Sequence, residues 1–315
     1  MSLRERGEKL MDPSAITHAA GEENDDDDEA GSRVGWAEML PETLVEVFKR
    51  LPLKDRLQTV PQICKTWRKA SLDPACWQFV DLKEWCISQN GEVIDRMVKL
   101  AVERSCGSLQ ELHVTNLNSD ASLQFLAQSR LSSMKTLCIP GSNVTENGLC
   151  EVILAMPTLV HLDISRCSAI KSRALEVIGK TCKSLTRLDR SMWPLTMASM
   201  GPSDDSEAMA IAQNMPKLKH LEMSSGWLSN AGLVAILDRC PDLEYLDVRN
   251  CWNVRFENSS AVSKSDKLLQ FHVSSIESDY DDDEDDEDYV DEWDYTTELW
   301  GDFDYLEDYI EDDIF

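Results

Sequence analysis

The sequence predicts an α+β protein in which a segment of three short helices leads into a long solenoid of strand–helix units, with acidic ends. Three observations predict this organisation. Apolar residues recur at helical spacing between residues 36 and 82, a second apolar pattern returns about every 25 residues from position 109, and acidic residues concentrate near both ends. The 315 residues are enough for about two domains with a sizeable core.

The helical segment is divided by prolines. Pro41 suits a first helical turn, and Pro52 ends the first piece. The face of that piece is formed by residues at i, i+3, i+4 and i+7, namely Leu44, Val47, Phe48 and Leu51. A second piece, 53–57, has room for little more than one turn, and Pro61 is expected to open a third. The face of the third piece is expected to hold Ile63, Cys64, Trp67 and Ala70. Helices this short bury too little surface to be stable alone, so we expect a partner.

The ordered residues of this segment resemble an F-box. The resemblance rests on Leu40-Pro41-Glu42, Leu51-Pro52-Leu53, Asp55, Leu57, Ile63-Cys64-Lys65 and Trp67-Arg68, followed by Trp77 and Val80-Asp81-Leu82. It implies docking on the Skp adaptor of a cullin-RING ubiquitin ligase. By position, it places twelve residues at or beneath that interface: Leu40, Pro41, Leu44, Val47, Phe48, Leu51, Leu53, Leu57, Val60, Ile63, Cys64 and Trp67. A plain helical hairpin would explain the apolar faces but not the ordered motif.

Charge divides the chain into segments. The formal net charge is −27, and residues 277–315 hold 21 acidic residues and no Lys or Arg. Residues 1–32 carry a balance of −7, which leaves about +1 for residues 33–276. We therefore expect a disordered acidic leader at 1–32, the F-box at 33–76, the solenoid at 77–276 and an acidic tail at 277–315.

The solenoid is predicted by a repeated strand signature. The pattern apolar-x-x-apolar-x-apolar begins at Leu109, Met134, Leu159, Leu185, Leu218, Leu243 and Leu268. Offsets of 25, 25, 26, 33, 25 and 25 residues match the leucine-rich repeat. Trp77, Val80 and Leu82 repeat the signature, so the F-box should run directly into the first rung. The whole arrangement is similar to plant F-box/leucine-rich-repeat proteins of the Skp-interacting-partner group, and Cys167 and Cys251 resemble the ninth-position cysteines of such repeats.

One rung departs from the pattern. Arg190 occupies a position that should be apolar, and the next repeat arrives late, so extra residues lie within 191–206. An insertion in a solenoid becomes a loop, which is often on the binding face. The extra residues can equally form a loop without a binding function, because a longer loop costs little extra entropy.

The concave sheet face is the candidate client-binding surface. Strand alternation places the third and fifth pattern positions there. The candidate residues are His161, Asp163, Arg187, Asp189, His220, Glu222, Tyr245, Asp247 and Arg249. Carboxylates at four successive fifth positions would stack about 4.8 Å apart, and Arg187 and Arg249 would relieve only part of their repulsion. Such a ladder suits a basic segment of a client protein, although a solvated acidic face needs no ligand.

Several other kinds of site find no support. His113 and His161 are two rungs apart, roughly 10 Å, which is too far to share a zinc ion. The sequence shows no phosphate loop, GxSxG or CxxC motif, so we expect no metal, cofactor or catalytic centre. The ten cysteines are expected to be thiols. The first residues of the sequence lack the apolar core of a signal peptide, and no apolar run approaches the length of a membrane span. We expect a cytoplasmic or nuclear protein, or one in both compartments.

The tail combines its acids with nine aromatic residues. A disordered spacer, a docking segment for a basic partner, a segment that folds back over the solenoid, and a cap for the last rung are all compatible with this composition. Direct nucleic-acid binding is disfavoured, because a tail without positive charge repels phosphates.

The F-box resemblance implies a non-catalytic substrate-receptor subunit of a Skp–cullin–F-box ubiquitin ligase, which would act by holding a client near the ubiquitin-charged enzyme. The alternative is a stand-alone acidic leucine-rich-repeat protein that binds basic clients without a ligase. An enzyme that uses one of the thiols is a third possibility, and it requires one unusually reactive cysteine.

Overall fold

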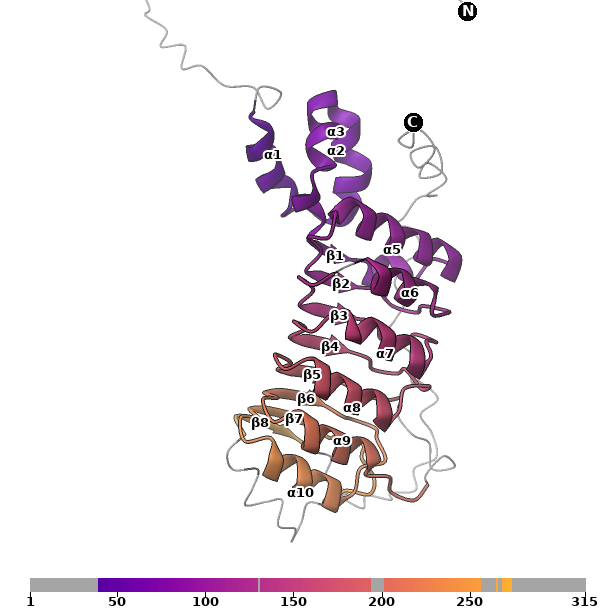
Figure 1. Ribbon diagram of the computed structural model, residues 1–315, viewed down its shortest axis with the longest axis vertical. Coiled ribbons are helices and arrows are strands. Elements are labelled where there is room, and N and C mark those ends of the chain that lie inside the picture. Colours follow the sequence, from indigo (N-terminus) through magenta and orange to yellow (C-terminus); the bar gives the residue numbers. More distant parts are fainter. Residues whose placement is uncertain (1–38, 130, 194–200, 256–264, 266–267, 274–315) are drawn as a thin grey trace, which may run out of the picture. The chain divides into compact units, whose positions relative to one another are not determined.

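The computed structural model describes residues 39–129, 131–193, 201–255, 265 and 268–273 (Figure 1). The chain divides into two units, Met1–Glu38 and Met39–Phe315. The predicted leader lies outside the described residues, as do the predicted tail and residues 194–200 of the predicted insertion. All helices and strands reported below belong to the second unit.

The N-terminal helices are α1 (Pro41–Phe48), α2 (Val60–Ile63) and α3 (Lys65–Ser71), with a π-helical turn at Asp55–Thr59. The prediction that Pro61 opens the third helix is wrong. Pro61 lies in the first turn of α2, which the π turn leads into, and the break falls at Cys64, whose backbone is extended (φ −161°, ψ 169°). A proline costs little in a first turn, where its missing N–H has no partner to lose. The break also separates Ile63, which is 53% exposed, from the buried Ala70.

Eight short strands form one parallel sheet in the order of the sequence. They are β1 (Phe79–Asp81), β2 (Glu111–His113), β3 (Thr136–Cys138), β4 (His161–Asp163), β5 (Arg187–Asp189), β6 (His220–Glu222), β7 (Tyr245–Asp247) and β8 (Gln270–His272). Each strand spans the third to fifth residues of its pattern, and equivalent residues of neighbouring strands are paired without offset. The predicted repeat phase is therefore the register of the sheet, including the first rung at β1.

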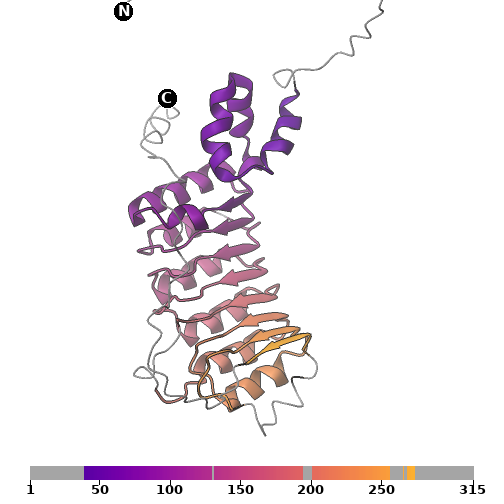
Figure 2. The same cartoon turned by 180° about the vertical axis from the view of Figure 1, so that it is seen from behind.

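Helices line one side of the column of strands, and the two opposite views agree on this (Figures 1 and 2). A 3-10 turn (Pro74–Trp77) precedes β1, and α4 (Lys83–Cys86) and α5 (Gly91–Ser105) follow it. The later helices are α6 (Ala121–Gln128), α7 (Glu146–Leu154), α8 (Ser172–Thr181), α9 (Ser206–Asn214) and α10 (Asn230–Arg239). The core lies between the two layers and is built from the fourth pattern positions and their neighbours. From β2 to β7 these fourth-position leucines are fully buried: Leu112, Leu137, Leu162, Leu188, Leu221 and Leu246.

Neighbouring rungs are joined through the first turns of their helices. Asp120, just before α6, accepts hydrogen bonds from the backbone N–H (2.7 Å) and hydroxyl of Thr145, which in turn caps α7. Asp205 accepts the same pair of bonds from Ser229 at the start of α10, at 2.8 and 2.6 Å. A carboxylate of one rung thus satisfies orphan donors at the helix start of the next rung.

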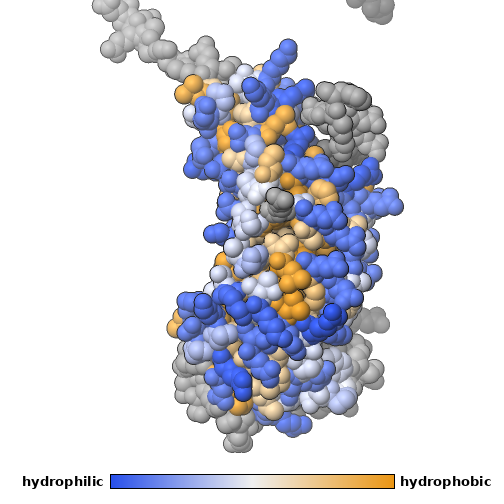
Figure 3. Space-filling model, viewed as in Figure 1, coloured by the Kyte–Doolittle hydropathy of each residue, from blue (hydrophilic) through white to orange (hydrophobic). Residues whose placement is uncertain are grey.

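The helical side is not uniformly polar. In the space-filling view, apolar residues gather in the middle of the visible face, around α6 to α8, between polar flanks (Figure 3). This part of the solenoid includes Leu154, which is 65% exposed at the end of α7.

Candidate functional site

The N-terminal helices present one set of predicted adaptor-binding residues and bury another. Leu44, Phe48 and Val60 are at most 2% exposed, and the Phe48 ring packs 5.1 Å from that of Trp67. Leu40 is 69% exposed. The remaining predicted residues are exposed or half-buried: Pro41, Val47, Leu51, Leu53, Leu57, Ile63, Cys64 and Trp67. The buried group is part of the hydrophobic core that continues into the solenoid, and several half-buried residues pack against it: Val47, Leu51, Leu53, Leu57 and Trp67.

Arg56 fixes this helical segment to the first rung. Its guanidinium is buried and donates hydrogen bonds to the carbonyl oxygens of Cys76 and, at 3.0 Å, of Phe79. Burial lowers the pKa of the guanidinium. The indole N–H of Trp77 donates to the carbonyl oxygen of Ser71 at 3.1 Å, which ties the end of α3 to the turn before β1. Arg56 is not among the residues predicted from the sequence, although it lies three residues after Leu53 and four before Val60, which places it on an apolar helix face.

The concave sheet face carries the predicted client-binding residues in the predicted order. Register places Asp163, Asp189, Glu222 and Asp247 on adjacent strands, one beside the next. His161, Arg187, His220 and Tyr245 form the parallel row two residues earlier.

The carboxylates on this face are paired more completely than the sequence indicated. Asp189 is contacted by His161 Nε2 at 2.9 Å and by Arg187 Nε at 3.0 Å. Arg187 Nη2 also donates to Glu222 Oε1 at 3.2 Å. Asp247 binds Arg249, with Nη2 2.7 Å from Oδ2. Asp189 and Asp247 are buried, whereas Arg187 and Arg249 keep 42% and 56% of their side chains exposed, so at these two pairs the guanidinium rather than the carboxylate faces solvent.

These contacts shift the acid–base behaviour of the face. Burial by itself would raise the pKa of Asp189, but the hydrogen bonds and charge of His161 and Arg187 lower it below its usual value. Burial would also raise the pKa of Asp247, but the hydrogen bonds and charge of Arg249 outweigh this effect and lower it. Burial and the nearby carboxylates of Asp247 and Glu222 raise the pKa of Tyr245. The two aspartates are therefore ionised at neutral pH and hold their arginines in place.

An aromatic stack crosses the end of the face. The rings of His220 and Tyr245 lie 4.0 Å apart and nearly parallel, with an interplanar angle of 4°, and His272 packs against Tyr245 at 5.3 Å. The rings join β6, β7 and β8 and give the face an aromatic surface beside Arg187 and Arg249, in which His272 is tilted by 47° against Tyr245.

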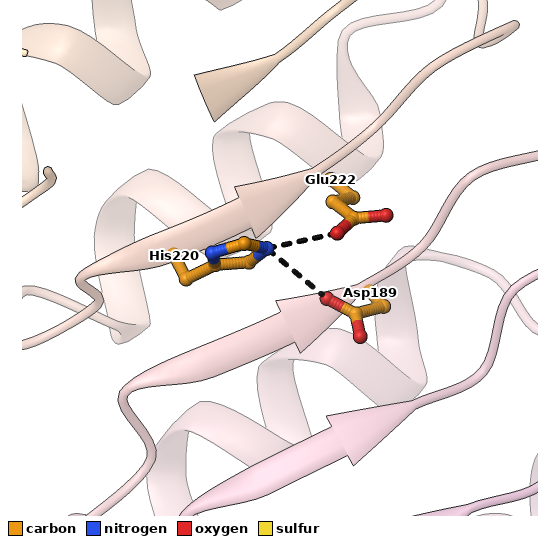
Figure 4. A group of neighbouring side chains, drawn as sticks. All are labelled: Asp189, His220 and Glu222. Atoms are coloured by element: carbon orange, nitrogen blue, oxygen red, sulfur yellow. Dashed lines mark hydrogen bonds and ion pairs between the residues drawn. The ribbon is translucent and has the colours of Figure 1, made fainter. Parts of the chain in front are cut away.

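Asp189, His220 and Glu222 come together closely enough to raise the question of a metal ion (Figure 4). Each offers one ligand atom, and these atoms lie within 4.8 Å of one another. However, Arg187 Nη2 lies 3.0 Å from Asp189 and 3.2 Å from Glu222, so a guanidinium already supplies the positive charge between them. The spacing of the histidines in the sequence does not reveal this grouping, which combines one histidine with carboxylates from two strands.

Comparison with known proteins identifies the family. A family description of F-box-like domains matches residues 41–83, and a leucine-rich-repeat description matches residues 214–237. The chain is 42% identical over 224 residues to F-box protein FBW2 of Arabidopsis thaliana, covering 71% of this chain and 70% of that protein. The chain belongs to the F-box/leucine-rich-repeat family. F-box protein SKIP19 of the same plant is 32% identical over 228 residues (72% of each chain), and putative F-box/LRR-repeat protein 21 is 34% identical over 236 residues, covering 70% of this chain and 76% of that protein. The family and the fold class predicted from sequence are confirmed.

The cysteines of this F-box/leucine-rich-repeat chain are all free thiols, and most are buried. Several donate to backbone carbonyls of the preceding rung: Cys167 to Ile139 at 3.3 Å and Cys251 to Met223 at 3.1 Å. Burial raises the pKa of both thiols to about 11, and that of Cys138 to about 12. Thiols with such pKa values are poor nucleophiles at neutral pH. The ninth-position cysteines therefore hold rungs together.

Arg190 occupies an apolar position of the repeat because its guanidinium is paired inside the core. It is 3% exposed, as its inward-facing position requires, and Nη2 donates to Glu207 at 2.9 Å and to the carbonyl oxygen of Ile170 at 2.8 Å. Glu207 belongs to α9, directly after the insertion. The ion pair thus joins the end of β5 to α9, the helix that the insertion moves later in the sequence. The repeat pattern alone does not predict this pairing.

Within the described residues, no helix combines the length and apolar character needed to cross a membrane.

Proposed function

We propose that this chain is the substrate-recognition subunit of a Skp–cullin–F-box ubiquitin ligase. The F-box would bind a Skp-type adaptor, and the solenoid would hold a client protein for ubiquitination. The observation that carries the proposal is the division of the F-box side chains into those buried in the core and exposed ones that include Leu40, Pro41 and Ile63. Exposed apolar side chains grouped on short helices are typical of a docking surface.

The client is assigned to the concave face. Tyrosine and arginine are the residue types that contribute most often to binding energy at protein interfaces. Here Tyr245 is stacked on His220, and Arg187 and Arg249 are held by carboxylates beneath them. A side chain that is already ordered loses less entropy when a partner binds.

A non-catalytic role fits the chemistry of the chain. The buried thiols have raised pKa values, and the carboxylate–histidine cluster is neutralised by Arg187. The proposed contribution to ubiquitin transfer is proximity, which needs no reactive side chain on the receptor.

The stand-alone alternative receives less support than the sequence suggested. A carboxylate ladder would attract a basic client most strongly if it lacked internal partners, but Asp189, Glu222 and Asp247 all bind arginine or histidine. A basic segment would have to displace these cations.

The test is co-purification of the full chain with a Skp-type adaptor. The double variant Leu40→Ala, Pro41→Ala should lose retention, because removing hot-spot contacts costs about 2 kcal/mol or more each. Since both residues are exposed, folding should be unchanged, which circular dichroism and thermal unfolding check. The matched control is Leu154→Ala, which truncates an apolar residue of similar exposure (65%) on α7. If the double variant retains the adaptor as well as the control does, the assigned surface is wrong; if the wild-type chain fails to retain it, the stand-alone role becomes the better account.

A further inference from the structure

Four loop segments that follow β4 to β7 share an unusual composition. Residues 164–170, 190–193, 223–229 and 248–255 contain four arginines, no Asp or Glu, and three of the nine tryptophans of the chain. We call these segments the arginine–tryptophan rim. Its exposed or half-buried members are Arg166, Trp193, Trp227, Arg249, Trp252 and Arg255.

The rim is a built surface, because backbone hydrogen bonds continue the sheet into the loops. The N–H of Arg166 donates to Ser191 at 2.8 Å, that of Met192 to Ser224 at 2.9 Å, and that of Ser225 to Arg249 at 2.8 Å. Parallel strands end at the same edge, so the four loops lie side by side. The Arg166 guanidinium stacks over the Trp193 ring at 4.1 Å.

The tryptophans of the rim are only partly covered. Trp193 is 59% exposed and Trp252 is 39% exposed, whereas Trp77 and Trp85 in the first rung are buried. Exposed indoles beside guanidinium groups are characteristic of binding hot spots. Exposed guanidinium groups and indoles, in loops without Asp or Glu, favour a partner that carries both negative charge and aromatic rings.

We propose that the occupant of the rim is the chain's own segment 277–315. That segment has 21 acidic residues, no Lys or Arg, and nine aromatic residues, so it complements the rim in both charge and ring contacts. It follows β8, and four strand spacings of about 4.8 Å place β4 only roughly 19 Å from β8. A chain of this length extends over roughly 130 Å, so it reaches every rim loop. A separate acidic protein or a nucleic acid would have to compete with this tethered segment and would be repelled by its 21 acidic residues.

The role proposed for the tail is separate from adaptor binding by the F-box. The rim borders the concave face, and Arg249 belongs to both surfaces. A docked tail shields that side of the face, so a client must displace the tail or bind beside it. Because the contact is intramolecular, its effective concentration is high even if each contact is weak.

Hydrogen exchange of the full chain tests the proposal. At low salt, amides in segment 277–315 should exchange several-fold more slowly than in an unstructured peptide of that sequence, and added salt should reduce the protection. The triple variant Arg166→Gln, Arg249→Gln, Arg255→Gln should abolish it, while β4 to β6 stay protected. The matched control replaces three exposed cations of the helical side, Lys99→Gln, Arg173→Gln and Lys180→Gln, and should leave the protection intact.

Four results would overturn the assignment. Unprotected tail amides in the wild-type chain exclude a docked tail, and equal loss in both triple variants reduces the effect to net charge. Protection that rises with protein concentration makes the partner a second copy. Rim-dependent binding of a short single-stranded RNA by the wild-type chain makes the rim a nucleic-acid surface.

Discussion

At the scale of single residues, the solenoid accommodates charge inside its core by pairing it. Arg190 faces inward at an apolar position, and Glu207 neutralises it from α9. A buried charge that loses its partner is far more costly than an exposed one, because neither water nor another group replaces the lost contact.

Glu207→Ala should therefore destabilise the protein by about 2 kcal/mol. This is less than the usual cost of breaking a buried ion pair, because Glu207 is itself partly exposed. The matched control is Glu244→Ala, which breaks the exposed Lys219–Glu244 pair of 2.9 Å and should cost less than about 1 kcal/mol. Urea unfolding measures both. Equal effects of the two variants would show that Arg190 finds other partners. Arg190→Leu, which removes the charge itself, should be tolerated better than Glu207→Ala.

The concave face shows what residue patterns predict and what they omit. The strand signature placed Asp163, Asp189, Glu222 and Asp247 on adjacent strands, because it recurs in each rung and side chains alternate between the two faces of a strand, which together fix the register even across the longer rung. The pairing of Asp189, Glu222 and Asp247 with His161, Arg187 and Arg249 could not be read in the same way, since it depends on rotamers of long side chains. The assignments of residues to an adaptor or a client remain predictions.

At the scale of elements, carboxylate links between rungs help to fix where α7 and α10 begin. They also impose a steric requirement on the helix they cap. A Cβ at Gly148 would lie 2.5 Å from the Asp120 carboxyl carbon, and one at Gly232 would lie 2.3 Å from an oxygen of Asp205. Both glycines therefore leave room for a carboxylate of the preceding rung.

Gly148→Ala should reduce the free energy of unfolding by about 1–3 kcal/mol, as overpacking does. This sign is diagnostic, because the same change inside an exposed helix stabilises by about 1 kcal/mol. The control Gly226→Ala meets only ordinary contacts, at 3.4 Å or more, and should stay within about 0.5 kcal/mol of the wild type. In an Asp120→Ala background the cost of Gly148→Ala should fall or reverse. Additive effects of the two changes would rule out the steric explanation.

Helices and strands were predictable to different degrees. The strand positions followed from the repeat, and the insertion at residues 191–206 was located by a single late repeat. The start of α3 was misplaced, because proline spacing alone does not reveal that a π turn carries the chain past Pro61 to a break at Cys64.

At the scale of the whole molecule, the F-box is joined to the solenoid by a shared apolar core and by directional hydrogen bonds. The guanidinium of Arg56 donates hydrogen bonds to the carbonyl oxygens of Cys76 and Phe79 in the first rung. The indole N–H of Trp77, in the turn before β1, donates to the carbonyl oxygen of Ser71 at the end of α3. A receptor that acts by proximity needs a defined connection between its adaptor-binding and client-binding parts. Arg56 is therefore expected to preserve that connection more than to stabilise the core.

Arg56→Met tests this expectation, because it keeps an apolar side chain of similar reach while removing both hydrogen bonds to the first rung. Amides of α1 and α3 should exchange several-fold faster, consistent with a local loss of about 2 kcal/mol from two unmatched carbonyl groups. Amides of β4 to β6 should be unchanged, because the repeats contact mainly their neighbours. Arg50→Met, at an exposed arginine of the same segment, is the control and should leave exchange at its wild-type rates. Uniformly faster exchange from α1 to β7 would instead show that Arg56 stabilises the molecule as one cooperative unit, and the connection would then depend on packing rather than on this one side chain.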